Sequence, residues 1–119
     1  MSNPSNIWTL NTEFATKSQF KKFHKKHPAE YSSCFANLSK VKSLLDSGYK
    51  LKSFKLGFFR SEGGELYRVG QSGIAGSKET RLYVYLYECE QTIYVLSIGT
   101  KESQQQDIKN AKKMIKKIK

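Results

Sequence analysis

The chain has 119 residues, of which 38% are hydrophobic and 13% aromatic, so it can form one domain with a modest core and is too apolar for a disordered chain. Twenty-one Lys and Arg residues against ten Asp and Glu residues give a net charge of +11, which favours polyanionic partners. No apolar run suits a transmembrane helix and Met1–Asn11 carries no secretory signal, so we expect a cytoplasmic protein without a membrane partner. The two cysteines, Cys34 and Cys89, exclude a disulfide framework.

The positive charge is concentrated in two blocks. Residues 17–55 hold ten basic and two acidic side chains, and residues 101–119 hold seven and two. Residues 56–100, by contrast, hold four basic and five acidic side chains. The two basic blocks are typical of surfaces that bind nucleic acid or an acidic protein. The alternative is that lysine-rich helices only keep a small domain soluble.

The first strand and the first helix are predicted near the N-terminus. Ile7–Phe14 carries strand-forming residues without a breaker, which predicts a strand. Thr16 and Gln19 form a capping-box pattern, in which the hydroxyl and the amide each satisfy a free donor at the helix end. This pattern predicts a short helix over Lys17–Lys26.

A second helix is predicted directly after the first. Pro28 is tolerated in the first turn of a helix, and Gly48 supplies the left-handed residue at which a helix ends. Between them, apolar residues recur at intervals of three and four and therefore share one face. These residues are Tyr31, Cys34, Phe35, Leu38, Val41 and Leu45. Two consecutive helices with a tight joint predict an antiparallel helical hairpin.

Beyond this helix the hydrophobic period changes to two, which predicts strands. Two short strands are expected at Leu56–Phe59 and Glu65–Val69, on either side of a turn at Gly63 and Gly64. The glycine-containing stretch Gln71–Thr80 is expected to be a flexible loop.

Two longer strands and a last helix complete the chain. Arg81–Glu88 alternates cleanly and Ile93–Ile98 follows after a turn, so the two are predicted to form a hairpin. Ser103 and Gln106 form a second capping-box pattern, ahead of a helix whose apolar stripe is flanked by lysines. The stripe consists of Ile108, Ala111, Ile115 and Ile118.

The order of elements predicts a single α+β domain over residues 1–119. The helical hairpin and the C-terminal helix should pack on a small, mainly antiparallel sheet and bury one of its faces. In the strand Arg81–Glu88 the leucines and Val84 should face this core, and the other set of side chains should point to an open face. That second set consists of Arg81, Tyr83, Tyr85 and Tyr87.

Several segments of the C-terminal half occur in an order that is typical of one toxin family. The strand GELYRV at Gly64–Val69 is followed by the glycine-rich loop Gly70–Lys78 and by the strand RLYVYLY at Arg81–Tyr87. The segment TIYVLSIGTK at Thr92–Lys101 and the basic tail Asp107–Lys119 complete the set. This set resembles the RelE/ParE superfamily of bacterial type II toxins, especially its HigB-like branch, and the RelE-like fold agrees with the predicted order of elements.

The resemblance implies a toxin that a cognate antitoxin protein holds inactive. The HigB and RelE branches are mRNA endonucleases, or mRNA interferases, that act in the decoding site of the ribosome, whereas the ParE branch inhibits DNA gyrase. An endoribonuclease that binds mRNA and rRNA is therefore the leading hypothesis. The alternatives are a gyrase inhibitor without nuclease activity and an inactive basic module that binds RNA or protein.

The chemistry of metal-independent RNA cleavage requires cations that neutralise the charge developing on the phosphorus. Arginine suits this task because its charge is permanent and its fork matches phosphate oxygens. Carried over from the family, the catalytic positions are Arg81, Arg68 and Lys101. Arg68 shares the parity of Leu66, which predicts an inward side chain, and Lys101 follows the last strand, where it could equally be a solvated loop lysine. The predicted RNA-binding residues are Lys78, Lys109, Lys112, Lys113 and Lys116.

The sequence departs from the family at the residue that acts as acid or base. Many nuclease members carry Tyr, His or Asp after the last strand, whereas here Lys101 is followed by Glu102, Ser103 and three glutamines. Asp107 suits the first turn of a helix through the helix dipole alone. Tyr83 or Tyr85 could act instead from the open face, although strand tyrosines usually serve packing.

A metal site is not expected, and neither is a cofactor. His24 and His27 lie three residues apart, but the lysines around them repel a cation and no carboxylate or thiol completes a ligand set. Cys34 lies on the apolar side of its helix and should belong to the core, whereas Cys89 lies in a turn.

Overall fold

The computed structural model describes residues 7–74 and 78–119, so the first six residues and residues 75–77 of the predicted loop lie outside the described part. Within this described part, the elements form an α+β fold with three α-helices and one five-stranded sheet, in the order β1-β5-β4-β3-β2. Only β1 runs parallel to its neighbour, so the sheet is mainly antiparallel, as predicted. The elements are β1 (Thr9–Asn11), α1 (Lys17–Lys26), α2 (Pro28–Asp46), β2 (Phe59–Ser61), β3 (Leu66–Gly70), β4 (Thr80–Tyr87), β5 (Thr92–Thr100) and α3 (Gln104–Ile118).

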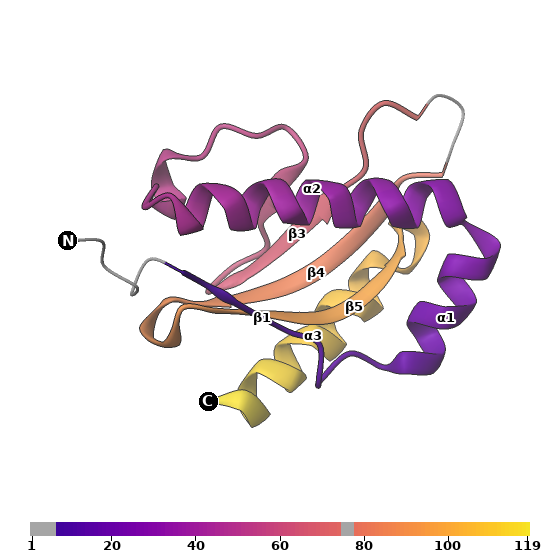
Figure 1. The fold of residues 1–119 in the computed structure, drawn as a ribbon. Coiled ribbons are helices and arrows are strands. Elements are labelled where there is room, and N and C mark those ends of the chain that lie inside the picture. Colours follow the sequence, from indigo (N-terminus) through magenta and orange to yellow (C-terminus); the bar gives the residue numbers. More distant parts are fainter. Residues whose placement is uncertain (1–6, 75–77) are drawn as a thin grey trace.

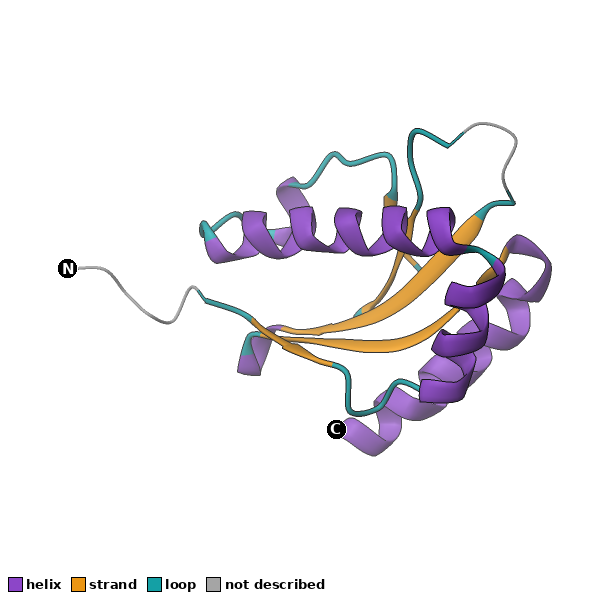
Figure 2. Ribbon diagram, turned by 45° about the vertical axis from the view of Figure 1, so that its right-hand side comes forward, coloured by secondary structure: helices purple, strands orange, loops and turns teal. Residues whose placement is uncertain are grey.

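The sheet is covered on both faces, with α1 and α2 on one side and α3 on the other (Figures 1 and 2). Leu82, Val84 and Leu86 belong to the core beneath α1 and α2, as the alternation predicted. The prediction that the opposite face is open is wrong. Tyr83 and Tyr85 are fully buried there, because the apolar stripe of α3 packs on them.

The N-terminal strand is shorter than the predicted Ile7–Phe14. Only Thr9–Asn11 pair with β5, because the carboxamide of Asn11 accepts a hydrogen bond from the amide of Glu13 and the chain turns there. The next helix begins at Lys17, as predicted, although the side chain of Thr16 makes no capping hydrogen bond. The main chain of Trp8, which precedes β1, is held by the carboxylate of Asp46 at the end of α2, at 2.7 Å.

The two predicted helix ends differ in how they form. Gly48 adopts a φ of 90° after α2, as predicted, and its amide donates to Leu45. At the start of α3 the predicted capping box is wrong. The hydroxyl of Ser103 donates to the carboxylate of Asp107 at 2.7 Å instead of capping a backbone amide, and Gln106 donates to Asn110.

The β2–β3 hairpin is shifted along the chain from its predicted position. β2 begins at Phe59, where the predicted strand ended, and extends to Ser61. The turn that follows contains Gly63 and Gly64, whose φ angles of 102° and 61° favour glycine. This shift brings Arg60 into the sheet, directly opposite Arg68.

The remaining predictions concern the burial of the two cysteines and the absence of a transmembrane helix. Cys34 is fully buried against the sheet, and burial raises the pKa of its thiol to about 12, whereas Cys89 is exposed. Among the helices of residues 7–74 and 78–119, none is long and apolar enough to cross a membrane.

Candidate functional site

Three arginines project from the same face at one end of the sheet. Arg60 on β2 is directly opposite Arg68 on β3, and two residues further along β3 Gly70 is directly opposite Arg81 on β4. Directly opposed residues, and residues two apart on one strand, share a face. The arginines therefore line the side of the sheet on which α3 packs, at the end that begins β4.

A cavity of about 330 Å³ opens between these arginines. Gly70, directly opposite Arg81, lines this cavity and carries no side chain that could fill it. The cavity is lined by Gly57, Phe58, Arg60, Arg68, Gly70, Gln71, Glu79, Thr80 and Arg81, and we call it the arginine cavity.

Two of the three guanidinium groups are partly withdrawn from solvent. The side chain of Arg81 is 12% exposed and that of Arg68 is 21% exposed, whereas Arg60 is exposed. Electrostatic interactions are stronger at partly desolvated sites than in bulk water. A phosphate in the cavity would therefore gain more from Arg81 and Arg68 than from surface lysines.

Each of the buried guanidinium groups has one carboxylate nearby. Arg68 Nη1 lies 3.4 Å from Glu62 Oε2, and Arg81 Nη2 lies 3.8 Å from Glu79 Oε2. Glu62 is itself largely buried, so it fixes Arg68 in the sheet. Arg68 shares a face of the sheet with Leu66, as predicted. Leu66 is buried beneath α3, whereas Arg68 lies further along the strand and lines the arginine cavity.

The loop beside the arginine cavity is anchored to α2. The side chain of Asn37 is buried and donates hydrogen bonds to the carbonyl of Gly70 at 2.8 Å and to the hydroxyl of Ser72 at 3.3 Å. The hydroxyl of Ser33 accepts from the amide of Ser72 at 2.9 Å. Gln71 accepts from the amide of Thr80 at 2.9 Å, which closes the base of the loop.

Lys101 and Lys78 lie beside the arginine cavity, in a second cavity of about 390 Å³. The two cavities share Glu79, and Lys101 Nζ lies 3.7 Å from its Oε2. Lys78 Nζ pairs with Glu102 at 2.6 Å. Both lysines are exposed. Lys101 and Arg81 lie near the same carboxylate, that of Glu79, but Lys101 does not line the arginine cavity.

The four predicted RNA-binding lysines of α3 are all exposed on its outer side. They are Lys109, Lys112, Lys113 and Lys116. They lie on the face of the sheet that carries the arginine cavity, because α3 packs on β4 and β5 there. Lys112 is close to the β2–β3 turn at Gly63.

The three residues considered as acid or base, Tyr83, Tyr85 and Asp107, are buried in the structure. Tyr83 and Tyr85 lie beneath α3, and burial raises the pKa of both, to about 12 for Tyr85. Burial also raises the pKa of Asp107, partly offset by the hydrogen bond from Ser103. None of the three lines the cavity.

Arg60 is an arginine of this site that was not predicted from the sequence. The predicted strand stopped at Phe59, so no strand position was assigned to Arg60. A signal was present, because Arg60 and Arg68 are equidistant from Gly64, the turn glycine. A tight hairpin around that glycine pairs them.

The histidine pair serves packing in the structure. His24 stacks on Tyr31 with ring centroids 4.3 Å apart, and His27 packs on Phe23 at 4.9 Å. No group of three or more metal-ligating side chains occurs within residues 7–74 and 78–119.

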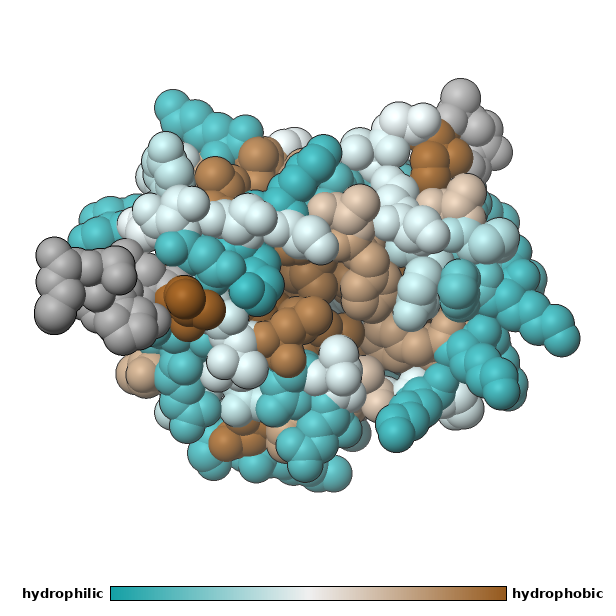
Figure 3. All heavy atoms as spheres, viewed as in Figure 1, coloured by the Kyte–Doolittle hydropathy of each residue, from teal (hydrophilic) through white to brown (hydrophobic). Residues whose placement is uncertain are grey.

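A separate apolar groove lies between α1, α2 and β5. Figure 3 shows apolar side chains gathered below α2, and Phe20, Phe35 and Val95 are among the residues that line this groove. The exposed side chains of Lys17 and Lys21 lie at the rim of this groove. The groove has a volume of about 440 Å³, and it lies on the opposite face of the sheet from the arginine cavity.

Comparison with known proteins relates the chain to others through its fold. No protein-family model and no curated protein matches the sequence. Among solved structures, the chain is similar to the free state of the E. coli toxin RelE, in a mutant with two arginines replaced by alanine. The TM-score is 0.55 and the identity 16%, over 92% of this chain and 98% of that chain. The chain therefore has the RelE fold.

Proposed function

We propose that this protein is the toxin of a toxin–antitoxin system, of the HigB-like kind, and that it cleaves mRNA on the ribosome at the arginine cavity. The observation that carries the proposal is the opposition of Arg60 and Arg68 on neighbouring strands, with Arg81 across the same hollow. Like charges directly opposite each other destabilise a sheet, so this arrangement favours a site for a bound polyanion. The RelE fold and the net charge of +11 support the same proposal.

The roles of the residues follow from the chemistry of RNA cleavage without a metal. The ribose 2′ oxygen attacks the neighbouring phosphorus, and negative charge accumulates on the phosphate oxygens in the transition state. Arg81 and Arg68 donate to those oxygens from partly desolvated positions, and Arg60 holds the phosphate from the open side. Lys101 adds a cation beside Glu79, at the edge of the site.

The lysines around the site bind the remainder of the RNA. Lys78 and Lys101 continue the positive surface on one side of the arginine cavity, and the four lysines of α3 continue it across the same face. Phosphate contacts of this kind release counterions, so binding to mRNA and rRNA should weaken steeply with salt. Ribosomes as the target imply a cytoplasmic site of action.

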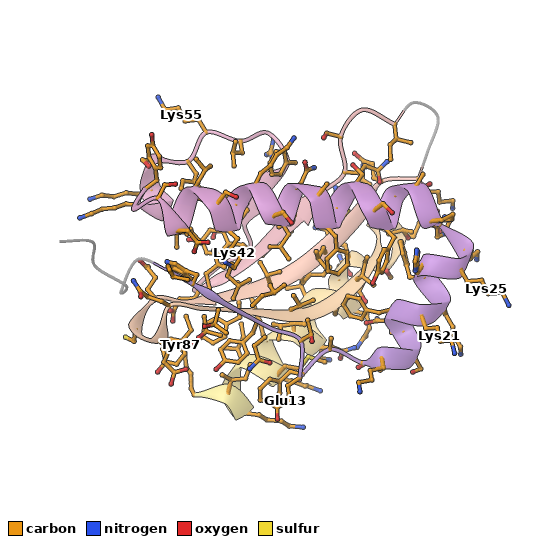
Figure 4. All side chains as sticks on the ribbon, viewed as in Figure 1. Glu13, Lys21, Lys25, Lys42, Lys55 and Tyr87 are labelled. Atoms are coloured by element: carbon orange, nitrogen blue, oxygen red, sulfur yellow. The ribbon has the colours of Figure 1, made fainter. Side chains whose placement is uncertain are left out.

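The test is inducible expression in bacteria, with growth followed and mRNA 5′ ends mapped. The wild type should arrest growth and produce new mRNA ends inside translated reading frames. Arg81→Ala and Arg60→Ala should each lose both effects, because removing one transition-state donor typically lowers the cleavage rate by about 10²–10³. The matched control is Lys25→Ala, which removes one positive charge from α1 at a residue that lines neither cavity (Figure 4). It should arrest growth like the wild type.

Two other outcomes would contradict the proposal. Growth arrest without new mRNA ends, retained in Arg81→Ala, would indicate an inhibitor of gyrase or another target. No arrest by a folded wild-type protein would indicate a basic binding module with the RelE fold and no toxin activity.

We also propose that the cognate antitoxin is an acidic protein whose amphipathic segment binds the apolar groove between α1 and α2. The apolar floor and the lysines at its rim match such a segment in both hydropathy and charge. The protein encoded beside the toxin should neutralise the wild type. It should fail to neutralise a Lys17→Glu, Lys21→Glu variant, and full neutralisation of that variant would contradict the groove as its binding site.

A further inference from the structure

Glu79 has a position that phosphate binding alone does not explain. Among the described residues that line the arginine cavity it is the one carboxylate. Its Oε2 atom lies 3.8 Å from Arg81 Nη2 and 3.7 Å from Lys101 Nζ, and its side chain is 62% exposed. A carboxylate at this place repels a bound phosphate, so it weakens the binding that the arginines provide.

The carboxylate of Glu79 remains able to accept a proton from a substrate. Its distances to Arg81 and Lys101 exceed those of a direct N–H···O hydrogen bond, which is 2.7–3.2 Å long. Within the described part of the chain, no group donates a hydrogen bond to it. Glu62 differs, because it is largely buried against Arg68 and does not line the cavity. Holding an arginine is therefore the role of Glu62.

The backbone holds Glu79 in place although it lies at the end of a loop. Its carbonyl accepts a hydrogen bond from the amide of Lys101 at 3.0 Å. The next amide, that of Thr80, donates to Gln71. The main chain of Glu79 is thus held between the start of β4 and the end of β5, which keeps its side chain at the cavity.

We propose that Glu79 is the general base of RNA cleavage, an inference that rests on the proposed endonuclease function. Its carboxylate takes the proton of the ribose 2′-hydroxyl while the 2′ oxygen forms a bond to the neighbouring phosphorus. The bond from phosphorus to the 5′ oxygen breaks, and a water molecule protonates the departing oxygen. The resulting hydroxide takes the proton from Glu79. The products are a 2′,3′-cyclic phosphate and a 5′-hydroxyl end.

This assignment places the base before β4 rather than after β5. The segment that follows Lys101 carries neither Tyr nor His, and Asp107 is buried in the first turn of α3. Glu79 lies beside Lys101 in space, because β4 and β5 are neighbours and Thr80 pairs with Thr100. Glu102 follows Lys101, but it pairs with Lys78 at 2.6 Å and does not line the arginine cavity. Glu79, from the adjacent strand end, is therefore the carboxylate that the site offers.

The experiment separates catalysis from binding. Bacterial ribosomes programmed with a short mRNA are mixed with excess protein, and single-turnover cleavage is measured across pH. Binding is measured with the same mRNA carrying a 2′-deoxy nucleotide at the mapped cut, which cannot be cleaved. Glu79→Gln should cleave about 10²–10⁴-fold more slowly. It should bind the deoxy mRNA at least as tightly as the wild type, because a negative charge has been removed from the phosphate site.

The pH profile and two further variants complete the test. The wild-type rate should fall as the pH falls, since the base must be ionised, and this acid limb should be lost in Glu79→Gln. Glu79→Asp should restore part of the rate. Glu13→Gln is the matched control, since Glu13 lies in the turn after β1, at the opposite edge of the sheet from β2 (Figure 4). It should cleave like the wild type.

Each outcome decides between the two proposals. Cleavage by Glu79→Gln within threefold of the wild type would overturn the assignment of the base and leave the endonuclease standing. A loss of cleavage matched by an equal loss of binding to the deoxy mRNA would also overturn it, because Glu79 would then serve only structure. Absence of cleavage by the folded wild type would overturn the endonuclease and the base together.

Discussion

The contact that seats α3 on the sheet can be tested with a single methyl group at Gly99. Gly99 is directly opposite Arg81, on the face that α3 covers. A Cβ at this position would overlap the carboxylate of Asp107 and lie 2.6 Å from the hydroxyl oxygen of Ser103. Asp107 is only 7% exposed and is held by Ser103, so neither group can turn away without moving the start of α3.

Gly99→Ala should therefore destabilise the protein by about 1–3 kcal/mol, the usual cost of forcing extra volume into a packed site. For a chain of this length, each kcal/mol lowers the melting temperature by roughly 4 °C. The loss should appear in urea unfolding followed by circular dichroism.

The control removes the two groups that the methyl would meet. In a Ser103→Ala, Asp107→Ala background the same Gly99→Ala change should cost less than about 0.5 kcal/mol, because residues in contact are not additive. An equal cost in both backgrounds would refute the proposed contact. So would a Gly99→Ala protein as stable as the wild type.

Two further predictions concern a hydrogen-bonded carboxylate and a buried hydroxyl. Burial raises the pKa of Asp46, but hydrogen bonds from Lys42 and Trp8 outweigh it and leave the pKa below its ordinary value. Asp46→Asn should therefore cost about 1 kcal/mol at pH 7. The difference should shrink as the pH falls below the ordinary carboxyl pKa and vanish below the lowered one, which a series of urea unfolding curves from pH 7 into the acid range can measure. Tyr83→Phe should leave both stability and RNA cleavage unchanged or slightly raise stability, because the buried hydroxyl has no hydrogen-bond partner among the described residues. A thermal melt and the cleavage assay check this, and a large loss in either would show that the hydroxyl is used.

The order of the elements could be predicted because each signal was local. The alternation of Arg81–Glu88, the helical spacing after Pro28 and the left-handed glycine at position 48 all depend on neighbouring residues. The face on which α3 packs could not be predicted in the same way. A helix that follows β5 can pack on either side of the sheet, and tyrosine suits both a buried and an exposed face.

The candidate site was predictable only in part for a related reason. Arg68 and Arg81 were identified from the resemblance, but the third arginine depends on the pairing of β2 with β3. The boundary of a three-residue strand is set by its partner rather than by its own sequence. Glu79 was missed because its proximity to Lys101 arises from the β4–β5 pairing, which brings together residues 22 positions apart.

The face beneath α3 changes character along its strands, and this change explains how one small domain holds both a core and a charged cavity. On β3 the side chains of this face run from Leu66 to Arg68 to Gly70, and on β4 they run from Tyr85 to Tyr83 to Arg81. Both strands thus pass from apolar groups to arginine in the same direction. The apolar ends are sealed by α3, and the arginine ends lie at the cavity. Because Arg81 is directly opposite Gly99, the contact that seats α3 also fixes the edge of the cavity, so a loosened α3 should impair the site before the fold itself is lost.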